Sequence, residues 1–245
     1  WAAQLIPDRF SCEFLLMVLG RQRKSLTMPD LSGASAKNLP GQGNATREAI
    51  LRKAVEISSM EGLESLSIGQ LAAALRMSKS GLFAHFGSKE ELQCATVDKA
   101  RDMFIDEVIR PALSATGLKR LRMLCDRWLS YVERRVFPGG CFFCAASLEF
   151  DDRPGVVRDR IVQVEKEWLS LLEKTAREAR AAGQLEKAVD SHQLTFEINA
   201  IAMGANWSFR LLHDNTAFSK AKNAILSRID QAARPGKRKS KGARR

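Results

Sequence analysis

The sequence predicts an all-α protein. Apolar residues recur at helical spacing along most of the chain, and no stretch alternates apolar and polar residues over the length of a useful strand. Glycine and proline residues fall between the periodic stretches, where they are expected to end helices. Hydrophobic residues make up 45% and charged residues 27% of the 245 residues, which is typical of a soluble globular protein with a substantial core.

Residues 1–43 are expected to form a flexible N-terminal arm. The part that follows Met28 is rich in Ser, Gly, Asn and Pro, and the apolar run at residues 14–19 lacks the cleavage site of a signal peptide. One hypothesis is that the biological start is Met28 and that residues 1–27 are not native. A genuine extension is the alternative.

Three short helices and the start of a fourth are predicted within residues 44–92. The expected elements are a helix over residues 46–60 that ends near Gly62, a helix that begins at Ile68 after the N-cap Ser67, a helix from the N-cap Ser78 to about Phe86, and a fourth helix after the N-cap Ser88. Gln70 and Glu91 follow two of these serines at the spacing of a capping box. The caps predict a compact tri-helical unit.

The third helix has the residue types of a helix that reads DNA. Leu82 and Phe86 are spaced to pack inward, while the first turn carries Ser78, Lys79 and Ser80, followed by Gly81. Lys79 can reach guanine acceptors or phosphates, and Gly81 leaves room for close approach of the backbone. Lys89 combines a positive charge with a helix N-terminus, which suits a phosphate.

Charge supports this interpretation through its placement and not through its total. The net charge is +11, but residues 44–92 hold six basic and six acidic residues. Between Arg76 and Lys89 stand three basic residues and no acid, so Lys79 and Lys89 are expected to be free of carboxylates. Residues 234–245 hold seven basic residues and no acid, and are expected to be a disordered tail. This tail either adds nonspecific DNA affinity or serves solubility.

Residues 77–92 read Met-Ser-Lys-Ser-Gly-Leu-Phe-Ala-His-Phe-Gly-Ser-Lys-Glu-Glu-Leu. This order resembles the TetR family of transcriptional regulators, in which a small hydrophobe, Ser, Lys and two small residues precede Leu-Tyr-x-His-Phe-x-Ser-Lys-Glu-Glu-Leu. The resemblance is close over residues 46–92, about a fifth of the chain. It implies a helix-turn-helix DNA-binding domain at residues 44–92 and a helical effector-binding and dimerisation domain at residues 93–233.

The resemblance also implies which residues meet DNA. Ser67 and His85 match family positions that touch phosphate, whereas Phe83 stands where many relatives carry a tyrosine that reaches phosphate, so one such bond is lost here. The expected DNA-binding residues are Ser67, Ser78, Lys79, Ser80, Gly81, Phe83, His85 and Lys89. Simpler alternatives exist: the serines act only as caps, His85 packs in the interior, and the lysines are solvated.

The second half of the chain is predicted to be helical throughout. The expected helices run to about Ile109, where Pro111 stops the first of them, and then over residues 119–137, 141–150, 157–179, 191–213 and 218–229. No apolar run approaches the length of about 20 residues that spans a bilayer, so a cytoplasmic protein without a membrane partner is expected.

The helix at residues 191–213 carries two apolar stripes, so we expect it to pack both on its own domain and on a partner in a homodimer. The predicted interface residues are Ile198, Ile201, Ala205, Leu212, Ala221 and Ile225. Burial within one subunit is the alternative. The predicted lining of an apolar effector pocket is Met103, Phe104, Trp128, Phe143, Trp168 and Phe209, although such residues also suit a plain core.

Five cysteines in helical patterns do not indicate a disulfide scaffold. Cys141 and Cys144 have Cys-x-x-Cys spacing, which can lower the pKa of a thiol at a helix start, but buried inert thiols are the favoured interpretation. No second Cys or His pair follows at zinc spacing, so no metal is expected.

The sequence thus predicts a homodimeric transcriptional regulator that binds a palindromic double-stranded DNA operator. A repressor released by an unknown small apolar or aromatic effector is favoured over a regulator without a ligand or one gated by thiols. An enzyme is disfavoured, because the three histidines lie in separate helices and no nucleophile motif, Gly-rich phosphate loop or metal cluster is present, and no cofactor is expected. A sequence-neutral nucleoid protein is a third possibility.

Overall fold

The computed structural model describes residues 42–234, and its regular elements are helices apart from an isolated bridge between Leu185 and Ala233. The helices are α2 (Gln42–Glu61), α3 (Ile68–Leu75), α4 (Lys79–Phe83), α5 (Lys89–Phe104), the π-helical segment η2 (Ile105–Ile109), α6 (Arg110–Ala112), α7 (Gly117–Glu133), α8 (Phe142–Phe150), α9 (Val156–Ala181), α10 (Ser191–Leu211) and α11 (Ala217–Ala232). The hypothesis on Met28, residues 1–41 of the predicted arm and residues 235–245 of the predicted tail lie outside the described residues. The last two residues of the predicted arm are the start of α2. The predicted all-α fold is confirmed.

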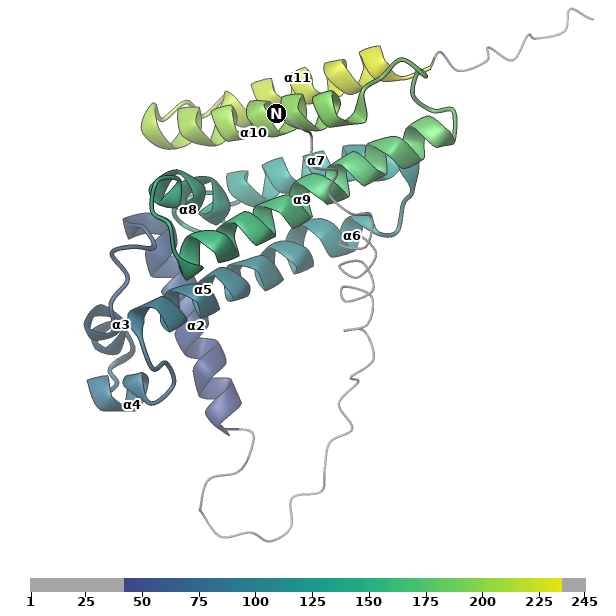
Figure 1. Ribbon diagram of the computed structural model, residues 1–245. Coiled ribbons are helices and arrows are strands. Elements are labelled where there is room, and N and C mark those ends of the chain that lie inside the picture. The colour runs from purple at the N-terminus through teal and green to yellow at the C-terminus, as the bar shows by residue number, and fades with distance from the viewer. Residues whose placement is uncertain (1–41, 235–245) are drawn as a thin grey trace, which may run out of the picture.

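The helices fall into an N-terminal helix-turn-helix domain and a C-terminal helical domain. Helices α3 and α4 lie at one end of the molecule, α10 and α11 lie at the other, and α5, α7 and α9 run between them (Figure 1). Leu71, Leu82 and Phe86 are fully buried and form the core of the first domain with α2. The core of the second domain lies where α7, α9 and α10 pack together. None of the helices between residues 42 and 234 is long and apolar enough to span a bilayer.

The predicted N-caps of the first domain are confirmed. The hydroxyl oxygens of Ser67, Ser78 and Ser88 accept hydrogen bonds from the backbone N–H groups three residues later, at 3.0 to 3.1 Å. The Glu91 carboxylate bonds back to the Gly87 N–H at 3.0 Å, one residue before the N-cap. These bonds satisfy backbone groups that a helix start leaves without partners.

The predicted stop at Pro111 is wrong. The helix that begins with α5 continues through η2 and α6 to Ala112, with Pro111 inside it. In η2 the Arg110 N–H donates to the Ile105 carbonyl five residues earlier. This wider turn places the proline, which has no N–H to donate, in the first turn of α6, where a missing donor costs little.

Other helix ends differ by a few residues. Helix α2 begins at Gln42, four residues before the predicted start, and α4 ends as an α-helix at Phe83 instead of Phe86. After Phe83 the chain tightens, because the His85 and Phe86 N–H groups donate to carbonyls three residues earlier. Helix α7 ends at Glu133, before the left-handed residue Arg135 (φ 54°), and not at residue 137.

Candidate DNA-binding surface and interior cavity

The exposed face of α4 forms the candidate DNA-binding surface (Figure 1). Ser78 caps the helix through the Gly81 N–H, and the Ser80 hydroxyl lies 3.3 Å from the Ser78 hydroxyl. Lys79, Ser80 and Phe83 are exposed, Phe83 with 51% of its surface accessible. A short polar first turn that stands clear of the rest of the protein has the form that a major groove admits.

Lys79 is the cation of this surface. Its side chain passes along Gly69 of α3, where an added Cβ would lie 3.5 Å from the Lys79 Cε. No carboxylate of residues 42–234 forms an ion pair with Lys79. Its charge therefore faces solvent without compensation from the described part of the protein.

Lys89 is not free of acids, and here the sequence-based expectation is wrong. Its Nζ lies 2.9 Å from Glu64 Oε1, and this hydrogen bond is the main cause of a lowered pKa at Glu64. The two residues are 25 positions apart and meet because α5 starts beside the α2–α3 connection. A phosphate at the start of α5 would compete with Glu64 for Lys89.

Two further predicted DNA residues have roles inside the protein. A Cβ on Gly81 would lie 2.9 Å from the Ser78 Oγ, so a side chain here would crowd the capping hydroxyl. His85 is half-buried, with its ring centroid 6.3 Å from that of Phe86. Ser67 and Ser88 are exposed at the starts of α3 and α5, so their hydroxyls serve as caps and remain accessible.

Glu149, near the end of α8, ties the C-terminal domain to the N-terminal helix-turn-helix domain (α2 to α4), which is the candidate DNA-binding unit. Its Oε2 accepts a hydrogen bond from the Leu63 N–H at 2.7 Å, and its Oε1 accepts one from the Glu64 N–H at 3.1 Å. Gly62, with a φ of +92°, turns these N–H groups towards the carboxylate, and a Cβ there would lie 2.6 Å from Glu149 Oε1. Sequence reasoning missed Glu149, because its partners are more than 80 residues away.

A second tie lies at the turn before α8. The Gly139 N–H donates to the Ser59 Oγ at 3.1 Å, close to the end of α2. An added Cβ at Gly139 would lie 1.5 Å from the Ser59 carbonyl oxygen, so the two backbones touch. The segment at residues 139–150 therefore contacts the DNA-binding unit at both of its ends.

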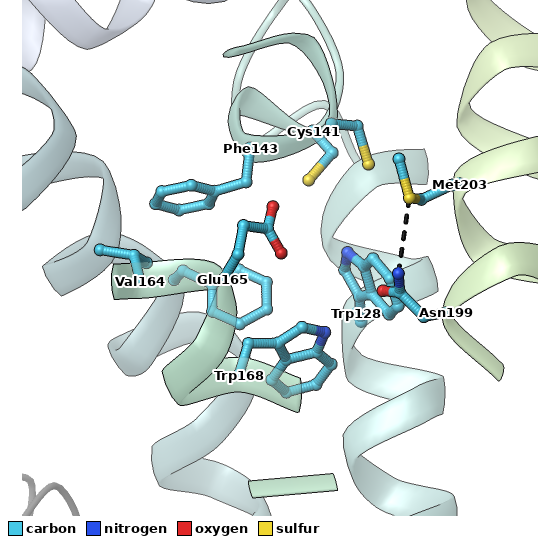
Figure 2. Close-up of a pocket in the computed structure, with 10 residues that line it drawn as sticks. Trp128, Cys141, Phe143, Val164, Glu165, Trp168, Asn199 and Met203 are labelled. Atoms are coloured by element: carbon cyan, nitrogen blue, oxygen red, sulfur yellow. Dashed lines mark hydrogen bonds between the residues drawn. The ribbon is translucent and has the colours of Figure 1, made fainter. Parts of the chain in front are cut away.

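A cavity of about 30 Å³, partly open to the surface, lies between α5, α7, α8, α9 and α10 (Figure 2). Four of the predicted pocket residues line it, namely Phe104, Trp128, Phe143 and Trp168, and Phe104 and Trp128 pack edge-on against the Trp168 ring at 5.0 and 5.3 Å between centroids. The lining also includes Cys141, Cys144, Glu165, Asn199 and Met203. The lining is thus mostly apolar, with four aromatic rings, one carboxyl, one amide and two thiols.

Two predicted pocket residues lie elsewhere, which corrects the expectation. Met103 borders a surface groove beside Arg135. Phe209 packs on Phe218 with 4.9 Å between ring centroids and lies under the Arg135 guanidinium at 5.4 Å. Both residues fall on the inward-facing side of a helix by their spacing, but the side chains of Met103 and Phe209 contact neighbours outside the cavity.

Glu165 was not predicted. Burial raises the pKa of this carboxyl to about 7, because the side chain has lost most of its water. Figure 2 shows the carboxylate pointing into the cavity towards Cys141. A signal existed in the sequence, since Glu165 follows Ile161 by four residues and so falls on the apolar face of its helix.

The two thiols of the cavity differ in acidity. The hydrogen bond from the Cys144 thiol is the main cause that lowers the pKa of Cys141, and the same contact raises the pKa of Cys144. The Trp168 indole N–H is buried without a hydrogen-bond partner within residues 42–234. In that same part of the chain no group of His, Cys, Asp and Glu has the arrangement of a metal site.

The outer face of α10 is apolar. Phe196, Trp207 and Leu211 have 64%, 52% and 62% of their surfaces exposed, and Ala200 and Gly204 lie between them at helical spacing. The second apolar stripe expected from the sequence comprised Ala200, Met203, Gly204, Trp207 and Leu211. All of these except the half-buried Met203, which lines the cavity, lie on this outer face.

The predicted interface residues need correction. Ile198, Ala205, Ala221 and Ile225 are buried by this subunit's own helices, so their side chains are not available to a partner. Ile201 is half-buried, and Leu212 is exposed at the end of α10.

Both halves of the chain match models of known protein families. The family model for bacterial regulatory proteins of the tetR family matches residues 50–95, and the model for the tetracyclin repressor-like C-terminal domain matches residues 117–225. Transcriptional regulator AcuR from Cereibacter sphaeroides is 23% identical over 150 residues, which cover 60% of this chain and 68% of that protein.

Solved structures agree with these matches. A TetR transcriptional regulator from Chloroflexus aurantiacus is 27% identical, with a TM-score of 0.74 over 79% of this chain and 98% of that chain. AibR, solved in complex with isovaleryl coenzyme A and operator DNA, has the same fold at 23% identity, with a TM-score of 0.60 over 74% of this chain and 96% of that chain.

Proposed function

Because the chain belongs to the TetR family of transcriptional regulators, we propose that it is a homodimeric repressor whose binding to a palindromic operator is relieved by a small effector. This is a family of regulators and not of enzymes. The observation that carries the proposal is the exposed first turn of α4, which presents Ser78, Lys79 and Ser80 with no described carboxylate paired to the lysine.

Base reading is assigned to α4, and phosphate contacts to its flanks. Lys79 reaches a base edge or a phosphate in the major groove, and Phe83 supplies apolar contact with a sugar or a thymine methyl. Ser67, His85 and Lys89 flank the helix and bind phosphate, with Lys89 leaving Glu64 to do so.

Replacing Lys79 by alanine is expected to weaken operator binding by about 1 to 3 kcal/mol, since one charged contact per half-site is lost. A selection of bound sequences from a random duplex pool would supply the operator, and titration of that duplex at several salt concentrations would give the affinity. Lys187→Ala, at an exposed lysine in the connection between α9 and α10, far from α4, is the matched control and should bind as the parent does.

Two results would count against this assignment. Unchanged affinity of the Lys79→Ala protein would remove α4 from the interface. Equal affinity of the parent for the selected duplex and for a random duplex at the same salt would favour a sequence-neutral DNA-binding protein instead.

The proposed dimer forms through the exposed stripe of α10 with its neighbour α11. Phe196, Trp207 and Leu211 are large apolar side chains that a monomer leaves in water, and Ala200 and Gly204 allow a second helix to come close. Two-fold symmetry would then set two copies of α4 about 34 Å apart, which is one turn of DNA.

Trp207→Asp is expected to dissociate the dimer, because a carboxylate would replace an aromatic anchor at the centre of the stripe. A loss of about 2 kcal/mol or more is typical of such positions, and analytical ultracentrifugation over a concentration series would measure it. Leu148→Asp changes an equally exposed leucine of α8, outside this face, and should leave the association unchanged. A dimer of parental stability in the Trp207→Asp protein would place the interface elsewhere.

The effector is assigned to the aromatic cavity. AibR was crystallised with an acyl coenzyme A and operator DNA, which supports a small-molecule effector for this chain as well. The cavity holds about 30 Å³, so a larger ligand requires the helices around it to separate. That separation would act on DNA binding through α8, whose Glu149 bonds to the DNA-binding unit.

A further inference from the structure

Cys141 and Cys144 have the placement of a pair that can form a disulfide. Cys141 is the N-cap of α8, with φ −71° and ψ 114°, and Cys144 lies in the first turn of that helix. A separation of three residues at a helix start brings the two Cα atoms within the range of about 4.4 to 6.8 Å that a disulfide requires. Both side chains are buried, and both line the same cavity.

The cavity limits what can reach the thiols. A volume of about 30 Å³ exceeds the ~10 to 15 Å³ that a single water requires, so it admits a molecule of about two heavy atoms. Glu165 borders both this cavity and a larger groove of about 280 Å³ on the surface.

The polar groups of the cavity suit an occupant with oxygen atoms. The Trp168 N–H has no partner among the described residues, and the Asn199 amide and Glu165 carboxyl face the same space (Figure 2). A metal ion is disfavoured, because these thiols and the carboxyl do not have the arrangement of a metal site in the described part of the chain. A small neutral oxidant with hydrogen-bonding oxygens fits both the size and the donors.

We propose that Cys141 and Cys144 form a dithiol site that hydrogen peroxide oxidises to an intramolecular disulfide. Cys141 is the attacking sulfur and Cys144 the resolving one. Glu165 relays the protons, and the Trp168 N–H together with Asn199 holds the peroxide oxygens.

The first step forms an S–O bond. Glu165, as a carboxylate, takes the proton of the Cys141 thiol. The resulting thiolate attacks one peroxide oxygen, the O–O bond breaks, and two electrons pass from sulfur to oxygen. The leaving hydroxide takes the proton back from Glu165 and departs as water, which leaves a sulfenic acid on Cys141. The lowered pKa of Cys141, caused by the Cys144 thiol beside it, favours this order of attack.

The second step forms the disulfide. Glu165 takes the proton of Cys144, and the Cys144 sulfur attacks the Cys141 sulfur. The S–O bond breaks, and the departing hydroxide receives the proton from Glu165. Overall, two thiols and one peroxide give one disulfide and two waters, and Glu165 ends as it began.

The consequence for DNA binding rests on the proposed function. The disulfide would tighten the first turn of α8, the helix whose other end bears Glu149 and its bonds to Leu63 and Glu64. The two sulfur atoms move when they bond to each other. The cavity wall would therefore pack differently against Trp128 and Phe143. Oxidation would thereby shift the DNA-binding unit relative to the C-terminal domain.

Mass spectrometry of the full chain tests the site without any DNA. After treatment with hydrogen peroxide, the tryptic peptide of residues 136–158, which contains only these two cysteines, should lose the mass of two hydrogens and regain it on reduction. Cys144→Ser should stop at a sulfenic acid on Cys141 that dimedone traps, and Cys141→Ser should give neither product. Cys94→Ser removes a half-exposed thiol of α5 outside the cavity and should leave the disulfide unaffected.

Two comparisons make the mechanism specific. Glu165→Gln should slow disulfide formation roughly 100-fold, in the range of lost general acid–base catalysis, with the circular dichroism spectrum unchanged. Cumene hydroperoxide, which is too large for the cavity, should react far more slowly than hydrogen peroxide. Unoxidised Cys141 and Cys144 after peroxide treatment of the folded protein, or equal rates with both peroxides, would overturn the proposal.

The effect of oxidation on DNA binding is measured in a separate experiment with operator DNA. Oxidised parent protein should bind the selected duplex about 5- to 150-fold more weakly than reduced protein, the range of typical allosteric couplings. Cys141→Ser should be insensitive to peroxide. If the disulfide forms but DNA affinity does not change, the modification site stands and its regulatory role is excluded. If the reduced protein binds no selected duplex, the proposed function is overturned and the site is not.

Discussion

Replacing Gly139 by alanine is expected to destabilise the protein by about 3 kcal/mol, the upper range of overpacking effects. An added Cβ would lie 1.5 Å from the Ser59 carbonyl oxygen and 2.7 Å from the Met60 nitrogen. Both are backbone atoms at the end of α2, so no side-chain rotation relieves the clash. The turn before α8 must move away from α2, which also breaks the hydrogen bond from the Gly139 N–H to Ser59 Oγ. Urea unfolding would measure the loss.

Gly69→Ala provides the matched control. An added Cβ at Gly69 would meet only the flexible Lys79 side chain, at an ordinary contact distance of 3.5 Å. Alanine inside α3 should therefore be neutral or stabilise by up to about 1 kcal/mol through helix propensity. If Gly139→Ala unfolds at the same urea concentration as Gly69→Ala, the close approach of the two backbones is not what holds these segments together.

Replacing Glu165 by glutamine is expected to change how stability depends on pH. Burial raises the pKa of this carboxyl from an ordinary 4.5 to about 7, so the folded state binds its proton more tightly than the unfolded state does. The parent is therefore most stable, with respect to this group, below pH 4.5 and loses stability as the pH rises to about 7. The loss amounts to about 3 kcal/mol, because one pKa unit corresponds to ~1.4 kcal/mol.

Glutamine does not titrate, so the Glu165→Gln protein should lack this loss. Its free energy of unfolding relative to the parent should rise by about 3 kcal/mol between pH 4.5 and pH 7.5, as measured by urea unfolding at each pH. Glu165→Leu, which removes the same titration with an apolar side chain, should show the same change with pH. Parallel pH profiles for all three proteins would mean that Glu165 is solvated in solution.

Local patterns in the sequence predicted local structure well. Ser67, Ser78 and Ser88 each cap a helix, because the bond runs to an N–H only three residues away and its spacing can be read directly. Contacts between distant residues could not be read. Lys89 and Glu64 are 25 residues apart, and the clash that makes Gly139 a glycine involves α2, about 80 residues earlier.

The cavity residues show the same difference between what local patterns predict and what depends on contacts between distant residues. Helical period identifies which residues face inward, and so it selected Phe104, Trp128 and Trp168. It does not tell which inward residues border a void, so Met103 and Phe209 were included and Glu165 was not. That distinction depends on how several helices fit together, which no single helix encodes.

The prediction of which α10 residues face a partner was partly wrong for a related reason. Periodicity correctly indicated two apolar faces, but each face is compatible with either the interior or a partner. The structure turns Ile198 and Ala205 inward and leaves Trp207 and Leu211 outside. The packing of α9 and α11 against α10 decides the choice.

Helix α8 has a thiol at one end and Glu149 at the other, and its nine residues span only about 14 Å at 1.5 Å per residue. A free energy that couples the two ends acts equally in both directions. An operator that fixes the Leu63 and Glu64 amides would hold Glu149, and through α8 it would hold the wall of the cavity. Bound DNA is then itself a ligand to which the cavity responds, and the reactivity of the thiols and the affinity for an effector become properties of the protein–DNA complex.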